Sequence, residues 1–199
     1  AAAQHSQSLY WMTAGIPGLK TVIPSNPADA KGLLLAAIRD DNPVIFCEAK
    51  LVLGAKGEVP EGDYEVPIGK AKRVREGGDV SLIGFGGTRP ICTAAAKQLA
   101  DEGIEADVLD LRSLQPLDEE AILETLAKTG RVVVVDEATP RSSVASDVAA
   151  LCVDEGFDFL QTPVKRVTAP HCPVPFSRPL EQAYLPSPAK VIEAVRAQA

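Results

Sequence analysis

The hydrophobic and polar positions of the first 50 residues form short apolar runs around one amphipathic stretch. "TVIP" (21–24) and "PVIFCEA" (43–49) are apolar runs of strand length. Between them, Ser25 or Asn26 supplies an N-cap and Pro27 lies in the first turn, which predicts a helix. Because a strand, a helix and a strand follow one another, we expect a βαβ unit whose two strands are parallel.

The same alternation continues through the rest of the chain. The run "VVVV" near residue 133 is typical of a strand that is buried on both faces of a sheet. Strands that alternate with helices predict an α/β fold with a doubly wound, mainly parallel sheet. The predicted strands are 69–75, 80–86, 106–112, 131–137 and 164–169, and the predicted helices are 88–102, 118–128, 141–155 and 187–198.

The predicted elements fall into two blocks. Residues 1–52 contain the βαβ unit and residues 68–199 contain the doubly wound sheet. Between them, residues 53–67 are rich in glycine and proline and predict a linker or a long loop. Two parallel strands with one helix cannot bury both faces of a sheet. The first block is therefore expected to be the later part of a domain that begins upstream.

Composition narrows the class of protein. The 199 residues are 46% hydrophobic and 24% charged, with a net charge of -7, as is usual for a soluble globular protein. The acidic balance argues against nucleic acid as a partner, and the lack of 18 consecutive apolar residues argues against a membrane span. The four cysteines show no metal-ligand spacing, which favours reduced thiols in the cytoplasm, with Cys172 the most exposed.

Three polar motifs adjoin predicted helices. "GFGGT" (84–88) opens a helix as phosphate loops do, but it lacks the dinucleotide fingerprint and a P-loop lysine, so a structural turn is favoured. "PLDEE" (116–120) is favoured as a helix cap over acid–base catalysis. Asp136 and Glu137 end a buried strand, where they could line a cleft or subunit seam or cap the next helix.

Two histidines and one helix end offer further chemistry. His5, in "QHSQS", belongs to a residue type that suits proton transfer or the stabilisation of a developing charge. His171 lies among prolines that stiffen the chain, which favours a structural or interface role. In "RDDNP" (39–43), free helix carbonyls with Asp40 or Asn42 could bind a monovalent cation, although an ordinary turn is favoured.

Taken together, these motifs resemble one known family. It is the beta subunit of the thiamine-diphosphate-dependent decarboxylating component of 2-oxoacid dehydrogenase complexes, which include pyruvate, branched-chain 2-oxoacid and acetoin dehydrogenases. The resemblance covers essentially all 199 residues. It implies that 1–52 is the C-terminal half of a pyrimidine-binding domain and that 68–199 is a transketolase C-terminal-like domain. The segments that carry it are "HSQS…IPGLKTVIPSNPADAKGLLLAAIRDDNPVIFCEAK", "EVP…Y", "VREGGDVSLIGFG", "DLRSLQPLD", "TGRVVVVDEA" and "PVPFSRPLE…YLPS".

The resemblance also implies partners, cofactors and site residues. It implies an α2β2 heterotetramer with an alpha subunit and a second beta subunit, docked on a lipoyl acyltransferase core. Thiamine diphosphate with Mg²⁺ would be shared with the alpha subunit. His5 matches the family's active-site histidine, placed near the substrate carboxylate or the acyl transfer to lipoyl. Ala37 (through its carbonyl), Asp40 and Asn42 match a structural potassium site of some members.

The sequence departs from the family at one point. The glutamate that activates the cofactor lies in the family well upstream of "HSQS", whereas only four residues precede His5 here. Glu48 belongs to a different motif and is not its substitute. We therefore expect an N-terminally incomplete oxidoreductase subunit, inactive when isolated, whose complex acts on pyruvate or acetoin. The alternatives are a non-catalytic dimerisation and docking module, or another thiamine enzyme such as a transketolase.

Overall fold

Two β-sheets organise the chain in the computed structural model, which describes residues 2–198. The smaller sheet contains β1 and β2, which pair in parallel and flank α3 in sequence, so the predicted βαβ unit is confirmed. The side chain of Asn26 accepts a 2.9 Å hydrogen bond from the amide of Asp29 and caps α3. The N-terminal elements are α1 (Ala2–Ser6), α2 (Tyr10–Ala14), β1 (Lys20–Val22), α3 (Pro27–Arg39), β2 (Val44–Phe46) and the 3₁₀ turn η1 (Lys50–Val52).

A strand from the second block completes the smaller sheet. β6 (Ser113–Gln115) pairs antiparallel with the other side of β1, which gives the order β2-β1-β6. Next to it, the amide of Ile23 donates a 2.8 Å hydrogen bond to the carbonyl of Arg112. The sequence pattern did not predict β6, because three residues are too few to show an alternation. The two blocks therefore share a sheet.

The larger sheet has the strand order β3-β5-β4-β7-β8, and only β3 runs antiparallel to its neighbour. This confirms the predicted α/β fold with a mainly parallel sheet. Its strands are β3 (Lys72–Arg75), β4 (Val80–Gly84), β5 (Ala106–Asp110), β7 (Val132–Asp136) and β8 (Lys165–Thr168). The other helical elements are α4 (Thr88–Ala100), α5 (Glu119–Thr129), α6 (Val144–Asp154), η2 (Phe157–Phe159), α7 (Arg178–Tyr184) and α8 (Pro188–Arg196).

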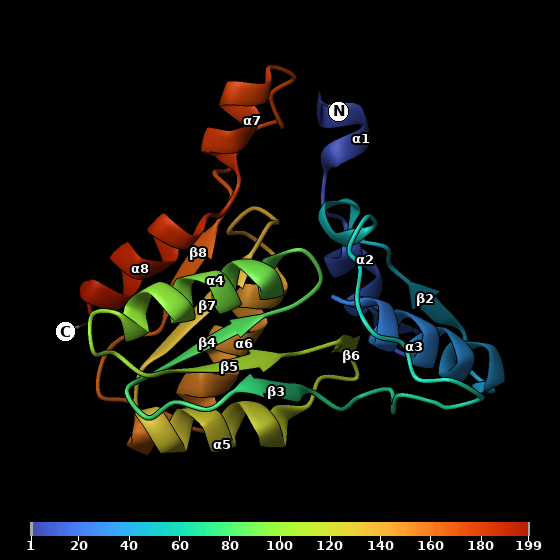
Figure 1. The fold of residues 1–199 in the computed structure, drawn as a ribbon, viewed down its shortest axis with the longest axis horizontal. Helices are drawn as coiled ribbons and strands as arrows, with labels where there is room; N and C mark the ends of the chain where they lie inside the picture. Colours follow the sequence, from blue (N-terminus) through green and yellow to red (C-terminus); the bar gives the residue numbers. More distant parts are fainter. Residues whose placement is uncertain (1, 199) are drawn as a thin grey trace.

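Helices cover both faces of the larger sheet (Figure 1). The valines of β7 show how the faces divide, because successive side chains of a strand point to opposite sides. Val132 and Val134 pack in the apolar core beneath α5 and α6. Val133 and Val135 pack in the core beneath α4 and α8. All four are fully buried, as the run of valines predicts.

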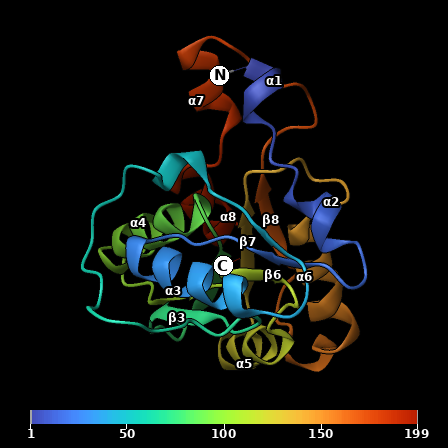
Figure 2. The same cartoon turned by 90° about the vertical axis from the view of Figure 1, so that its right-hand side faces the viewer.

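Two short helices lie together beyond the end of the larger sheet. α7 and α1 are neighbours in both ribbon views, although they come from opposite ends of the chain (Figures 1 and 2). The sequence pattern did not predict either helix. They extend from the carboxyl end of β8 and from the N-terminus, respectively, and they form the outer wall of the site described below. No helix within residues 2–198 is long and apolar enough to cross a membrane.

The predicted linker packs along α3 as a long loop. Tyr64 and Val66 contact α3 so closely that a Cβ at Gly32 would lie 2.5 Å from Val66 and 2.8 Å from Tyr64. The hydroxyl of Tyr64 donates a 2.8 Å hydrogen bond to the carbonyl of Ala28. The ammonium of Lys31 lies 4.8 Å from the centre of the Tyr64 ring. The loop therefore covers one side of the N-terminal βαβ unit.

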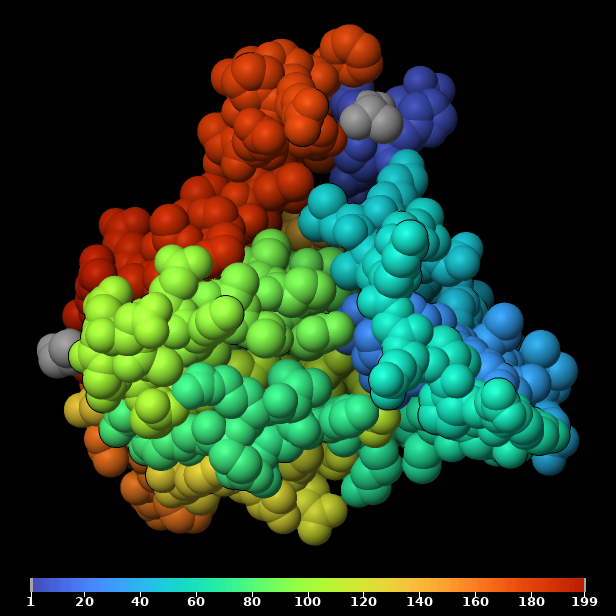
Figure 3. Space-filling view, viewed as in Figure 1, coloured from blue at the N-terminus to red at the C-terminus, as the bar shows by residue number. Residues whose placement is uncertain are grey.

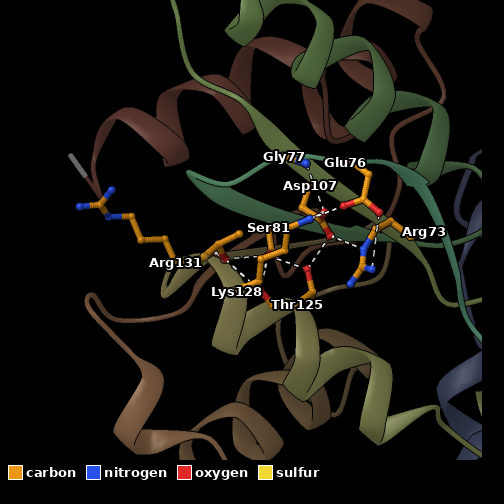
Figure 4. Close-up of polar contacts among 9 residues, drawn as sticks. Arg73, Glu76, Gly77, Ser81, Asp107, Thr125, Lys128 and Arg131 are labelled. Carbon is orange, nitrogen blue, oxygen red and sulfur yellow. Dashed lines mark hydrogen bonds and ion pairs between the residues drawn. The ribbon is translucent and has the colours of Figure 1, made fainter.

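A buried ionic cluster lies near the amino end of the larger sheet (Figure 4). The carboxylate of Asp107, on β5, accepts hydrogen bonds from Arg73 at 3.0 Å, Thr125 at 2.7 Å and Lys128 at 2.8 Å. Ser81, on the adjacent β4, donates a 2.9 Å hydrogen bond to the carbonyl of Thr125. The cluster joins β3, β4, β5 and α5 on the side of the molecule away from α1 and α7.

Candidate active site

A cavity of about 530 Å³ lies where the N-terminal residues, the segment near residue 50 and α7 meet. These three parts of the chain gather at one end of the molecule in the space-filling view (Figure 3). The volume is in the range of small-molecule sites. The cavity is lined by residues 5–10, 45 and 47–51 and by Thr13, Ile23, Glu137, Glu181 and Leu185.

His5 lies on this cavity, exposed, on the last turn of α1. Its backbone carbonyl accepts a hydrogen bond from the ammonium of Lys50, which lies in η1. Glu48 lines the same cavity from the segment between β2 and η1. The fold thus brings His5 close to the exposed carboxylate of Glu48 and the ammonium group of Lys50, which lie more than 40 residues away in the sequence.

Asp136 and Glu137 have separate roles. Asp136 is fully buried and accepts hydrogen bonds from the amides of Ala138 at 2.8 Å and Ala145 at 3.2 Å, so it holds the start of α6. Glu137 is half-buried and lines the cavity. Burial raises the pKa of the Glu137 carboxyl, and a hydrogen bond with Ser8 opposes that shift. The sequence left open whether these carboxylates hold a helix start or line a cleft. Asp136 does the first, and Glu137 does the second.

The glycine turn predicted at 84–88 brings the two blocks into close contact. Gly86 has a φ of 48°, and a Cβ there would lie 2.7 Å from Ile23. A Cβ at Gly87 would lie 3.1 Å from Leu51 and 3.3 Å from the Glu137 carboxylate. Glycine allows both the backbone conformation and the close approach. This is the structural turn that the sequence analysis favoured.

The "PLDEE" motif caps a helix, as predicted. The carboxylate of Asp118 faces the amide of Ala121 at 3.5 Å in the first turn of α5. The same carboxylate accepts a 2.8 Å hydrogen bond from the amide of Ala71, which precedes β3. Asp118 lies outside the lining of the cavity of His5.

The residues matched to a potassium site lie away from His5. Asp40 and Asn42 follow the C-terminal end of α3, whereas Ala37 lies within its last turn. The Asp40 carboxylate accepts hydrogen bonds from the ammonium of Lys20 at 2.5 Å and from the Asn42 amide at 2.9 Å, and these hold its pKa at about 2. A bound cation would have to share this carboxylate with Lys20. The cation site stays a prediction.

A smaller cavity of about 310 Å³ adjoins the first and contains His171 in its lining. Gln7, Ser8, Leu9 and Glu137 line both cavities. His171 and Cys172 are exposed on the loop before α7. The other cysteines are buried or half-buried and unpaired, which confirms Cys172 as the exposed thiol.

Sequence reasoning missed the parts of the site that come from distant segments. Glu181 and Leu185, from α7 and the residue after it, close the outer wall of the cavity. A proline in the first turn of α7 was a signal for this helix. The hydrogen bond from Tyr10 to Asp136 spans 126 residues of sequence, and no local pattern indicates it.

Each of the two blocks matches a known domain family. Residues 1–56 match the family described as "Transketolase, pyrimidine binding domain", and residues 69–191 match "Transketolase, C-terminal domain". A solved structure entitled "Split gene transketolase, inactive beta4 tetramer" superposes with a TM-score of 0.81 at 25% identity, covering 98% of this chain and 62% of that one.

Curated relatives are beta subunits of dehydrogenases. The chain is 59% identical to the beta subunit of acetoin:2,6-dichlorophenolindophenol oxidoreductase of Bacillus subtilis, over 96% of this chain and 56% of that protein. It is 45% identical to the 2-oxoisovalerate dehydrogenase subunit beta of Bacillus subtilis, over 98% of this chain and 60% of the relative. It is 43% identical to the pyruvate dehydrogenase E1 component subunit beta of Rhizobium meliloti, over 98% of this chain and 43% of the relative.

These matches confirm the resemblance read from the sequence motifs. The chain spans roughly half the length of the curated relatives it matches, between 43% and 60% of each. The matched domains follow one another in the order that the fold contains, the pyrimidine-binding part first and the C-terminal domain second. The chain belongs to the transketolase-related family in which these two domains form the beta subunits of acetoin and 2-oxoacid dehydrogenases.

Proposed function

We propose that this chain supplies the beta-subunit part of a thiamine-diphosphate-dependent dehydrogenase component that oxidises acetoin. The observation that carries the proposal is the 59% identity, over 96% of the chain, with the beta subunit of an acetoin oxidoreductase. The identity with pyruvate and 2-oxoisovalerate dehydrogenase beta subunits is lower, at 43% and 45%. Pyruvate is the second candidate substrate.

The cavity suits one end of the cofactor. Ile23, Ile45 and Leu51 give it apolar walls, and His5 and Glu137 give it a few polar groups, which is a lining that fits a flat heterocyclic ring. No group of three or more His, Cys, Asp or Glu side chains placed to hold a metal exists within residues 2–198. The lining of the cavity fits the ring end of thiamine diphosphate. From the family resemblance, we assign the metal-bound diphosphate to the alpha subunit.

His5 is the proposed catalytic residue of this chain. When bound, thiamine diphosphate would supply the nucleophilic carbon for chemistry at the substrate carbonyl. His5, exposed at the cavity and anchored through its own carbonyl by Lys50, can exchange a proton with a substrate or acyl oxygen. Apolar side chains and α7 line the cavity next to that position.

Partners follow from the same proposal. An alpha subunit and a second copy of this chain would complete an α2β2 assembly, which would pass the acyl group to a lipoyl-bearing acyltransferase core. The isolated chain would be inactive. A solved relative, described as an inactive tetramer of beta chains, supports this part of the proposal.

The test is to co-purify, with an alpha subunit, a beta polypeptide that contains these 199 residues together with the upstream glutamate expected from the family, and to follow reduction of 2,6-dichlorophenolindophenol with acetoin, pyruvate or 2-oxoisovalerate. We expect the complex to reduce the dye fastest with acetoin. His5→Ala should lower kcat by about 10² to 10⁴-fold, the usual contribution of a positioned acid–base group, without releasing the alpha subunit.

His171→Ala serves as the matched control, because it removes the other histidine of the chain from the adjoining cavity. If His5→Ala and His171→Ala reduce activity equally, His5 has no special role. A complex that forms but turns over none of the three substrates would instead support the non-catalytic docking module. Faster turnover of pyruvate would reassign the substrate.

A further inference from the structure

One buried side chain fixes the segment that carries His5. Among residues 2–20, all of which the structure describes, Tyr10 is the only one that is buried, with 7% of its surface exposed. Its ring packs edge-on against Phe85, with the ring centres 5.4 Å apart and the planes at 86°. Phe85 follows β4, so Tyr10 inserts into the core of the second block and the residues around it remain at the surface.

The hydroxyl of Tyr10 donates a hydrogen bond to the carboxylate of Asp136. Asp136 is the last residue of β7, and its carboxylate is already held by the backbone amides of Ala138 and Ala145. Two amide donors from a rigid strand end and a helix start fix the position of the carboxylate. The carboxylate in turn fixes the tyrosine.

The charges around the pair favour the protonation states in which the hydroxyl of Tyr10 donates the hydrogen bond and the carboxylate of Asp136 accepts it. Burial, followed by the nearby carboxylates of Asp136 and Glu137, raises the pKa of Tyr10 well above its ordinary value, so the hydroxyl keeps its proton. Burial also raises the pKa of Asp136, while the bonds from Tyr10 and the two amides oppose that rise. Asp147, on α6, adds to the negative charge facing the pair.

The pair lies directly behind the catalytic cavity. Tyr10 lines that cavity together with residues 5–9, which precede it in the chain. Ser8 interacts with Glu137, the residue that follows Asp136. A displacement of Tyr10 would therefore move both Ser8 and His5 relative to the wall formed by Glu137.

We propose that Asp136 and Tyr10 are a pair of positioning residues, which hold His5 and Ser8 at the cavity by anchoring residues 5–10 to the end of β7. The effect on catalysis rests on the function proposed above. The effect on the position of the segment does not, and it can be measured in the absence of any substrate.

The chain contains a matched control for this pair. Ser25 donates a hydrogen bond to Asp110, the last residue of β5. Both residues are buried, and this pair also joins a hydroxyl of the first block to a carboxylate at a strand end of the second. Neither residue lines the cavity of His5.

The first experiment uses Trp11, the only tryptophan of the chain, as a reporter next to Tyr10. Trp11 is 36% exposed. Tyr10→Phe retains the ring that packs on Phe85 and removes only the donor. We expect its Trp11 emission to shift to longer wavelength and to become easier to quench with acrylamide, while Ser25→Ala leaves both at the wild-type values. Asp136→Asn should reproduce the change of Tyr10→Phe.

The second experiment measures steady-state kinetics of the same variants in the complex with the alpha subunit. A displacement of about 1 Å at a reacting group costs on the order of 10²-fold in rate, so Tyr10→Phe should lower kcat far more than it changes KM. Ser25→Ala should leave kcat unchanged, even where it lowers the unfolding midpoint as much as Tyr10→Phe does.

Two outcomes would overturn the proposal. One is Trp11 fluorescence in Tyr10→Phe and Asp136→Asn that is the same as in the wild type. The other is a loss of kcat that follows the loss of stability equally in Tyr10→Phe and Ser25→Ala. If the wild-type complex turns over no substrate, the proposed function fails, and the fluorescence of Trp11 still decides whether the pair positions the segment.

Discussion

Two buried aspartates at opposite ends of β5 differ in what surrounds them. Asp107 and Asp110 lie three residues apart, and neither side chain reaches solvent. Burial raises the pKa of Asp107, but hydrogen bonds from Lys128, Thr125 and Arg73 outweigh it, and the net shift is downward. Burial raises the pKa of Asp110 to about 6, because Ser25 and the more distant Arg89, 3.8 Å away, compensate only in part.

The difference separates the amino end of the larger sheet, where an ionic cluster lies, from the carboxyl end, which is next to the cavity. At the amino end, the cationic side chains of Arg73 and Lys128 form an ionic cluster with the carboxylates of Asp107 and Glu76. At the carboxyl end, Asp110, Asp136 and Glu137 are all buried or half-buried with a raised pKa. Asp110 and Asp136 contact the first block through Ser25 and Tyr10, and Glu137 lines the cavity. Ligands bind at the carboxyl ends of strands in such sheets, and destabilised ionisable groups concentrate there.

The largest effect on the free energy of unfolding is expected at Asp107, near the amino end of β5. Asp107→Ala leaves Lys128 and Arg73 without their buried partner, so we expect a loss of about 3 kcal/mol in the free energy of unfolding at pH 7. Both cations are about one-third exposed and keep Glu76 as a second ion-pair partner, which holds the loss at the lower end of the usual range. Urea denaturation measures it.

The pH dependence of that loss provides the control. A lowered pKa means that the stabilisation by Asp107 is present above the ordinary pKa of an aspartate and disappears as the pH falls through the folded-state pKa. The difference between the wild type and Asp107→Ala should therefore narrow toward pH 3. A difference that is constant from pH 3 to pH 7 would mean that packing, not charge, explains the loss.

The second-largest effect concerns Asp110, whose contribution to the free energy of unfolding depends on pH in the opposite direction. The pKa of Asp110 rises from 3.8 to about 6 on folding, so its ionisation destabilises the fold as the pH rises from 4 through 6. Two pKa units correspond to about 3 kcal/mol. As the pH rises from 4 to 7, the free energy of unfolding of Asp110→Asn should therefore increase relative to the wild type by up to this amount. Equal stability differences at the two pH values would contradict this account.

Most of the fold could be predicted because its signals are local. The four valines of β7, the cap at Asn26 and the cap at Asp118 are each recognisable within a few residues of sequence. β6 could not be predicted, because its partner β1 lies about 90 residues earlier and three residues carry no alternation. Short elements that exist only through distant contacts leave no periodic pattern.

The site was predictable to a smaller extent. His5 lines a cavity, and its catalytic role, expected from the family resemblance, stays a prediction. The sequence predicts Asp136 and Glu137 at a strand end and leaves two roles open for them. Which carboxylate faces the cavity depends on the turn after β7, and on Tyr10 occupying the position beside Asp136. The contribution of Lys50 depends on a side chain reaching the backbone of α1. Such contacts are properties of the assembled chain.

The smallest effects compare one hydroxyl at each end of β5. Thr125→Val removes a donor from Asp107, and Ser25→Ala removes a donor from Asp110. Each should cost about 1.5 to 3 kcal/mol at pH 7, as hydrogen bonds to charged groups do. The lowered pKa keeps Asp107 more ionised at pH 4 than an ordinary aspartate, so the cost of Thr125→Val should persist there to a larger extent. Asp110 takes up a proton near pH 6, so most of the cost of Ser25→Ala should be lost at pH 4. Denaturation of both variants at pH 4 and pH 7 distinguishes the two ends, and parallel losses would show that the two carboxylates do not differ in charge state.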